Sequence, residues 1–107
     1  MDLQKKKSFF NTYLICIIAF MKIEFDPKKA AINLKKHGVS FDEAATCLLD
    51  DQALVQEDYD AEDENRWILI GMSNQARLLV VIYTTREDAI RLISARKPTQ
   101  KEENYYA

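Results

Sequence analysis

Three apolar runs in the C-terminal half of the chain, separated by two short polar turns, limit the fold more than any other feature. Residues 66–72, 76–84 and 90–95 are rich in β-branched and aromatic side chains. Consecutive strands joined by such tight connections pair antiparallel. The sequence therefore predicts an antiparallel meander, with residues 53–56 as a further strand before it.

The first of two helices predicted before this sheet has clear start and stop signals. Asp26 suits the N-cap and Pro27 the first helical position, whereas Gly38 provides a typical C-terminal stop. Three apolar residues at helical spacing predict a buried stripe: Ala30, Ala31 and Leu34. We therefore expect this stripe to pack against the sheet.

A second helix follows at once, because Ser40-x-x-Glu43 matches a capping box. After the last strand, Pro98 is expected to open a short polar helix, whose Tyr105 and Tyr106 could pack back on the sheet. These elements predict an α+β fold: two N-terminal helices packed on a curved antiparallel sheet of about four strands, with a short C-terminal helix.

Residues 1–20 differ from the rest of the chain. Three lysines precede about a dozen mostly apolar residues, as in a signal peptide, but no small-x-small cleavage pattern follows. The stretch is also short for a membrane span. We expect translation to begin at Met21, so that residues 21–107 form a single domain. An uncleaved anchor and an additional helix are the alternatives.

The charge is unevenly distributed, although its total is only −2. Residues 42–64 contain ten acidic side chains and no basic one, whereas residues 66–101 contain seven basic and two acidic side chains. The total argues against nucleic-acid binding through bulk charge, but the C-terminal half has a positive potential that the total hides. The acidic segment could equally be a solvated face that pairs with these bases.

Neither cysteine points to a disulfide or a metal. Cys16 and Cys47 provide no disulfide framework, and a single histidine leaves few ligands for a zinc site. Cys47 lies in an apolar run typical of a core position. We therefore expect no metal, no cofactor and a reducing, cytoplasmic location.

Cations on the last predicted strand are the main candidates for a binding site. Arg91 lies inside the run 90–95, and Arg96 and Lys97 follow at its end. Guanidinium groups bind phosphate in a bidentate manner, so this stretch suits a phosphodiester ligand. His37, at a predicted helix end, is the residue type that ordinarily titrates near neutrality.

Several sequence blocks follow one another over nearly all of residues 22–106: Phe25-Asp26-Pro27, Lys36-His37-Gly38-Val39-Ser40-Phe41, Arg66-Trp67-Ile68, Val80-Val81-x-Tyr83-Thr84-x-Arg86 and Ile93-Ser94-Ala95-Arg96-Lys97. In this order and spacing, they resemble the BrnT toxin family. The resemblance implies a RelE-like fold and a ribonuclease toxin of a type II toxin–antitoxin pair. It also implies a BrnA-like antitoxin that binds the toxin and the operator DNA, with a toxin homodimer as one arrangement inside that complex.

Two positions depart from the family pattern. A glycine expected before the Glu64-Asn65-Arg66-Trp67 block is absent, and Pro98 replaces a small residue after Lys97. Neither change removes a titratable group, but Pro98 bears on where the last helix begins.

Metal-independent RNA cleavage requires a base for the 2′-hydroxyl, an acid for the leaving 5′-oxygen and cations for the transition state. With the resemblance, six residues are predicted to be catalytic: Lys36, His37, Arg66, Tyr83, Arg91 and Arg96. Four more are predicted to contact RNA: Lys35, Trp67, Arg86 and Lys97. Glu64 is a further candidate for proton transfer, and the sequence assigns neither the base nor the acid.

Most of these residues could have structural roles instead of catalytic or RNA-binding ones. His37 could bond a carbonyl or favour the dipole at the helix end. Arg91 could pair with an acid such as Glu24 or Asp26 across the sheet, and Arg66 with the acidic residues before it. Trp67 is typical of a core position.

The resemblance, together with these residues, implies a metal-independent endoribonuclease that arrests translation and growth. The alternative is a catalytically inactive module that binds an antitoxin and tunes operon repression, which the negative net charge and the divergent segment near Asn65 favour. A membrane-tethered form using residues 1–20 is a third hypothesis. Because the run 76–84 is apolar on both faces, one sheet face needs helices and the other a partner, either the antitoxin or a second copy.

Overall fold

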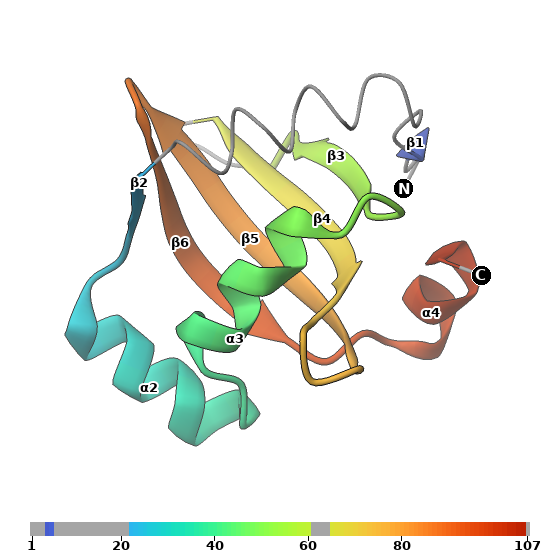
Figure 1. Cartoon of the computed structure of the whole chain (residues 1–107), viewed down its shortest axis with the longest axis horizontal. Helices are drawn as coiled ribbons and strands as arrows, with labels where there is room; N and C mark the ends of the chain where they lie inside the picture. Colours follow the sequence, from blue (N-terminus) through green and yellow to red (C-terminus); the bar gives the residue numbers. More distant parts are fainter. Residues whose placement is uncertain (1–3, 6–21, 61–64, 107) are drawn as a thin grey trace.

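A computed structural model describes residues 4–5, 22–60 and 65–106 of the chain. Its centre is a six-stranded sheet in the order β1-β3-β4-β5-β6-β2 (Figure 1). The strands are β1 (Gln4–Lys5), β2 (Lys22–Glu24), β3 (Leu54–Asp58), β4 (Arg66–Met72), β5 (Leu78–Arg86) and β6 (Ala89–Arg96). Neighbouring strands are antiparallel, except β2 and β6, which are parallel.

The helices lie on the two sides of this sheet (Figure 1). They are α2 (Pro27–His37), α3 (Phe41–Thr46), the short 3-10 helix η1 (Cys47–Leu49) and α4 (Gln100–Tyr106). The main core fills the space between α2, α3 and one face, called the helix face. The opposite face, called the open face, is partly covered by α4. This is the predicted α+β architecture.

The strands β4, β5 and β6 form the predicted antiparallel meander. The sheet is wider than about four strands because β2 pairs in parallel with β6 and β1 pairs with β3. The two residues of β1 come from the N-terminal extension. Met21 and most of residues 1–20 lie outside the described residues, so the expected start and the membrane tether stay predictions.

The predicted start and stop of α2 are confirmed. The Asp26 carboxylate accepts a hydrogen bond from the Lys28 backbone N–H at 2.8 Å. Gly38 adopts a left-handed conformation with φ of 69°, which glycine tolerates, and its N–H donates to the Leu34 carbonyl at 2.8 Å. Of the predicted apolar stripe, Ala30 packs against the main core, but Leu34 is 51% exposed and Ala31 is also exposed, so the prediction is wrong for these two residues.

A buried asparagine takes the place of that stripe. The Asn33 amide nitrogen donates to the carbonyls of Val39 and Ala95 at 3.1 and 2.8 Å, and its oxygen accepts from the Ala95 N–H at 3.2 Å. These bonds satisfy backbone groups that burial would otherwise leave unpaired. Asn33 thereby fixes α2 to the end of β6.

Only half of the predicted capping box at α3 forms. The Ser40 hydroxyl accepts from the Glu43 N–H at 3.1 Å, but the buried Glu43 carboxylate turns to other partners. It accepts from the Ser73 hydroxyl at 2.6 Å and from two guanidinium nitrogens of Arg77. The hydrogen bond from Arg77 is the main cause that lowers the pKa of Glu43. This network ties α3 to the turn between β4 and β5.

The last helix begins at Gln100 rather than at Pro98. Thr99 and Glu102 form a complete capping box, in which each side chain accepts the backbone N–H of the other, at 3.2 and 2.8 Å. Tyr105 and Tyr106 pack back on the open face, as predicted, against a small core of Leu54, Ile68, Ile70 and Val80.

Candidate functional site

A row of five polar residues, four of them charged, crosses the open face at the end that α4 does not cover. It consists of directly paired residues on five neighbouring strands, from β3 to β2: Asp58, Arg66, Thr84, Arg91 and Glu24. Paired residues project to the same side of a sheet, and residues four apart on one strand do so too. Arg66 therefore shares its side with Ile70, which packs under α4. We call this set the arginine row.

The two arginines of the row can act on one ligand. Arg66 and Arg91 flank Thr84, so their backbones are two strand spacings apart, about 10 Å. Extended arginine side chains can converge over such a distance on a single phosphate group. Thr84 is 2% exposed, and its hydroxyl donates to the Asn65 carbonyl. Thr84 thus fixes the start of β4, which carries Arg66.

Arg66 keeps a donor that the protein does not use. Within the described ranges, two buried side-chain atoms have no hydrogen-bond partner: Nε of Arg66 and Oε1 of Gln56. Gln56 lies two residues before Asp58 on β3 and therefore faces the same side. Buried polar atoms normally have partners, so these two are exceptions, and both belong to residues that face the side of the arginine row.

Arg91 forms an ion pair, which is the structural role that the sequence analysis gave as the alternative to a catalytic one. Its guanidinium lies 3.7 Å from the Glu24 carboxylate, and both side chains are 32% exposed. At this separation and exposure the pair is weak, and both groups remain accessible from solvent.

Arg96 faces the same side but belongs to another part of the sheet. It pairs with Val80, four residues along β5 from Thr84, which corresponds to roughly 13 Å. Its guanidinium binds both oxygens of Glu102, at 2.7 and 2.9 Å. The hydrogen bonds from Arg96 are the main cause that lowers the pKa of Glu102 to about 2. Arg96 therefore anchors α4 to β6.

The predicted residues on α2 lie outside the arginine row. His37 is half-buried at the end of α2, one turn after Asn33, which bonds to Ala95 near the end of β6. Lys35 and Lys36 are exposed beside it. Ala95 is four residues from Arg91, so His37 lies towards the opposite end of that strand.

The two aromatic candidates face the helix side of the sheet. Tyr83 is 9% exposed in the main core, and burial raises its pKa to about 12. Trp67 is half-buried and packs against the same core, as expected for a core residue rather than for one that stacks on RNA. Arg86 is exposed on the open face, two residues beyond Thr84. Lys97 is exposed after β6, and Glu64 lies outside the described residues.

The described part of the chain brings together no group of three or more metal-ligating side chains. In the same ranges, no helix has the length and apolar character needed to cross a membrane. Cys47 is a free, fully buried thiol, as its sequence context predicted, and burial raises its pKa to about 12.

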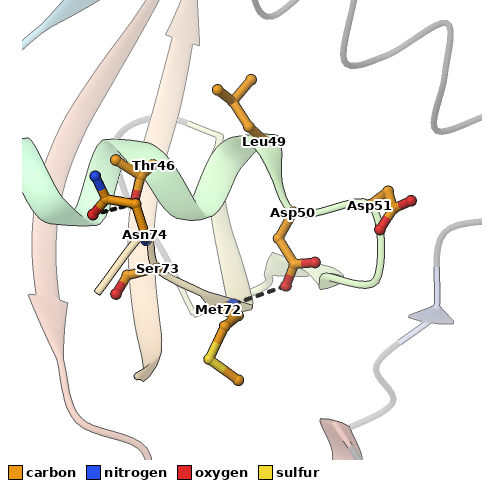
Figure 2. A pocket seen from close by; sticks show the side chains of 7 residues that line it. All are labelled: Thr46, Leu49, Asp50, Asp51, Met72, Ser73 and Asn74. Atoms are coloured by element: carbon orange, nitrogen blue, oxygen red, sulfur yellow. Dashed lines mark hydrogen bonds between the residues drawn. The ribbon is translucent and has the colours of Figure 1, made fainter. Parts of the chain in front are cut away.

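An open groove of about 570 Å³ lies elsewhere, between η1 and the β4–β5 turn (Figure 2). Its lining residues are Thr46, Leu49, Asp50, Asp51, Met72, Ser73 and Asn74. Asp50 is engaged there, because its carboxylate accepts from the Met72 N–H at 2.8 Å and from the Tyr106 hydroxyl at 2.6 Å. Burial is the first cause that raises the pKa of Tyr106. With carboxylates in its wall, this groove does not suit a phosphate ligand.

Sequence reasoning identified Arg66 and Arg91 but did not place them in one row. From the sequence, Glu24 was expected only as an ion-pair partner. No role at the site was predicted for Asp58, Thr84 or Gln56. Strand alternation and antiparallel pairing would have predicted that Arg66 and Thr84 face the same side.

Comparisons with known proteins agree on one family. Residues 25–102 match the family model described as the ribonuclease toxin, BrnT, of type II toxin–antitoxin system. Among solved structures, the crystal structure of the Brucella abortus ribonuclease toxin BrnT is similar, with 26% sequence identity and a TM-score of 0.56. That alignment covers 75% of this chain and 99% of the other. A search among curated proteins gave no significant match.

Proposed function

Since this chain belongs to the BrnT family of ribonuclease toxins of type II toxin–antitoxin systems, we propose that it cleaves RNA without a metal, at the arginine row, and thereby arrests translation and growth. Membership of the family implies a cognate antitoxin. We propose that this antitoxin is BrnA-like, that operator DNA is bound only through it, and that two toxins occur in the repressing complex.

The observation that supports this site is the placement of Arg66 and Arg91 on either side of Thr84. Two fixed guanidinium groups can hold the non-bridging oxygens of one phosphodiester and stabilise the added negative charge of a phosphorane-like transition state. They supply the positive charge that other nucleases obtain from a metal ion.

The reaction follows from the groups around these cations. The 2′-oxygen of the ribose attacks phosphorus and forms a new bond, while the bond from phosphorus to the 5′-oxygen breaks. Glu24, beside Arg91, is the carboxylate that can accept the 2′-hydroxyl proton. Water protonates the leaving 5′-oxygen, and the hydroxide that remains takes the proton held by Glu24, which restores the carboxylate. The products are a 2′,3′-cyclic phosphate and a 5′-hydroxyl end.

The other predicted catalytic residues have different support. Arg96 has a structural partner in Glu102, and Tyr83 lies in the core on the helix face. Lys36 and His37 lie towards the far end of β6, and their catalytic roles stay predictions. We propose Arg66, Arg91 and Glu24 as the residues that act on the phosphodiester and its 2′-hydroxyl.

The test is RNA cleavage by the full chain in the presence of EDTA. We expect 2′,3′-cyclic phosphate ends, and a loss of roughly 100- to 1000-fold in rate for Arg66→Ala and for Arg91→Ala. Lys101→Ala, an exposed lysine on α4, is the matched control and should keep the wild-type rate. Cleavage that EDTA abolishes would reject the metal-independent mechanism, and full activity of Arg91→Ala would reject the site.

A second function is favoured by the ion pairs of the last strand. Arg96 binds Glu102 closely and Arg91 lies in a weak pair with Glu24, so both arginines of this strand have acidic partners within the protein. A catalytically inactive module of this kind would bind antitoxin and tune repression. Expression of the toxin alone separates the two functions: growth arrest with new RNA ends supports the nuclease, and normal growth with abundant protein supports the module.

A further inference from the structure

The outer side of α2 carries a concentrated positive charge that the proposed cleavage site does not use. Ile32 is surrounded by four lysines at the positions that neighbour it on a helix, three and four residues before and after it. They are Lys28, Lys29, Lys35 and Lys36, and all four are exposed. The helix contains no acidic residue. We call these four residues the lysine face.

The lysine face is held in a fixed orientation by the opposite side of α2. Ala30 packs against the main core, and Asn33 is bound to the backbone of Val39 and Ala95 by three hydrogen bonds. Both termini of the helix are capped, at Asp26 and Gly38. The four lysines therefore project from a rigid helix, and a ligand meets them without first ordering the backbone.

The chemistry of this surface favours a polyanion over a protein partner. Two large apolar residues of α2 are exposed, Ile32 at 64% and Leu34 at 51%. They are two positions apart, which places them on the helix at roughly 200° to one another. They therefore form no continuous apolar patch of the kind that is enriched at the buried centre of protein interfaces. The exposed surface of α2 is therefore positively charged and has no continuous apolar patch.

The spacing of the lysines fits a nucleic-acid backbone. The pair Lys28 and Lys29 is separated from the pair Lys35 and Lys36 by seven residues, or about 10 Å along the helix axis. A separation of this size lets the two lysine pairs contact different phosphates of one RNA strand. Lysine binds phosphate as a mobile point charge, which suits contacts that do not depend on sequence.

The lysine face is also connected to the proposed cleavage site. Glu24 of the arginine row ends β2, and α2 begins at Pro27, three residues later. Figure 1 shows β2 at the edge of the sheet and α2 directly below it. An RNA strand that leaves the open face at this edge can continue over α2.

We propose that the lysine face is an RNA-binding exosite, which holds the phosphate backbone of RNA beyond the segment cleaved at the arginine row. The inference deepens the proposed ribonuclease function, because it assigns long RNA, rather than short oligonucleotides, as the preferred substrate. Positive charge on α2 gives a negatively charged protein a local surface for a negatively charged polymer.

The experiment measures binding of a 24-nucleotide 2′-O-methyl RNA to the full chain at several KCl concentrations. This RNA has no free 2′-hydroxyl, so binding is measured independently of cleavage. For the variant with Lys28, Lys29, Lys35 and Lys36 all changed to Gln, we expect the slope of log K against log salt to become less steep by about 3. That value is roughly 0.7 for each phosphate that a lysine no longer neutralises. Glutamine has nearly the helix propensity of lysine, so α2 should remain folded.

Two controls make the result decisive. Lys101→Gln changes an exposed lysine on another helix and should leave the slope unchanged. Arg91→Gln should reduce cleavage of ordinary RNA while the steep salt dependence from α2 remains. A fourfold variant that keeps the wild-type slope and affinity would overturn the exosite. A wild-type chain that binds through α2 but cuts no RNA would instead reject the proposed function and leave the exosite in place.

Discussion

Glu102→Gln tests the ion pair that joins β6 to α4. The substitution keeps the shape of the side chain and one oxygen that can accept the Thr99 N–H, but it removes the charge facing Arg96. Glu102 is 8% exposed and accepts two hydrogen bonds from Arg96. We therefore expect the helix and its cap to form, with a lower free energy of unfolding.

The size of the effect follows from the pKa of Glu102. Hydrogen bonds from Arg96 lower this pKa from its ordinary value of 4.5 to about 2. At about 1.4 kcal/mol per pKa unit, the difference corresponds to roughly 3 kcal/mol. The Arg96 side chain is 33% exposed, so solvent screening reduces the expected contribution to about 1–2 kcal/mol. Because the folded-state pKa is lowered, the contribution is complete above pH 4.5 and is lost as pH falls towards 2.

Urea unfolding followed by Trp67 fluorescence measures this directly. At pH 7, Glu102→Gln should be less stable than the wild type by about 1–2 kcal/mol, and at about pH 2.5 the difference should be less than half of that. Glu103→Gln, an exposed neighbour on the same helix, is the control and should change stability by under about 0.5 kcal/mol. A deficit of equal size at both pH values would refute the electrostatic reasoning.

Two further substitutions test the packing that holds the sheet and helices together. Asn33→Ala removes the partners of three buried backbone groups, so the free energy of unfolding measured in urea should fall by about 2–3 kcal/mol. The control Ile32→Ala should lower it by less than about 0.5 kcal/mol. Equal effects of the two substitutions would show that Asn33 is dispensable. Gly71→Ala places a Cβ 2.9 Å from the Leu69 side chain and 3.1 Å from the Cys47 carbonyl oxygen. We therefore expect the free energy of unfolding, measured by thermal unfolding, to fall by about 1–3 kcal/mol. An unchanged melting temperature would contradict this close approach.

The meander and the caps were predictable because their signals are local. Turn length, alternation and the Asp26 and Gly38 caps each act within a few residues, and the structure confirms them. The capping box of Thr99 and Glu102 carries an equally local signal, which begins one residue after the proline that was expected to open the helix. The parallel pairing of β2 with β6 has no such signal, since alternation does not specify which strand is the neighbour.

The buried side of α2 was mispredicted for a physical reason. Leu34 completes an apolar spacing with Ala30, but the backbone of β6 at Ala95 offers an N–H and a carbonyl that need partners. Asn33 satisfies both, and that gain outweighs the burial of one leucine, which remains 51% exposed. Predicting a buried polar residue on this helix therefore required knowledge of the strand beside it.

The arginine row depends on a β-bulge that alternation alone does not reveal. Arg91 and Arg96 are five residues apart, so in a regular strand they would face opposite sides of the sheet. The shift in register beside Ile82 and Tyr83 adds one residue to β6, and both arginines then face the open side. Without it, Arg91 would stand opposite Thr85 and point towards the helix-covered core, where an unpaired guanidinium is strongly disfavoured. The bulge therefore determines whether the last strand delivers a cation to the proposed RNA site.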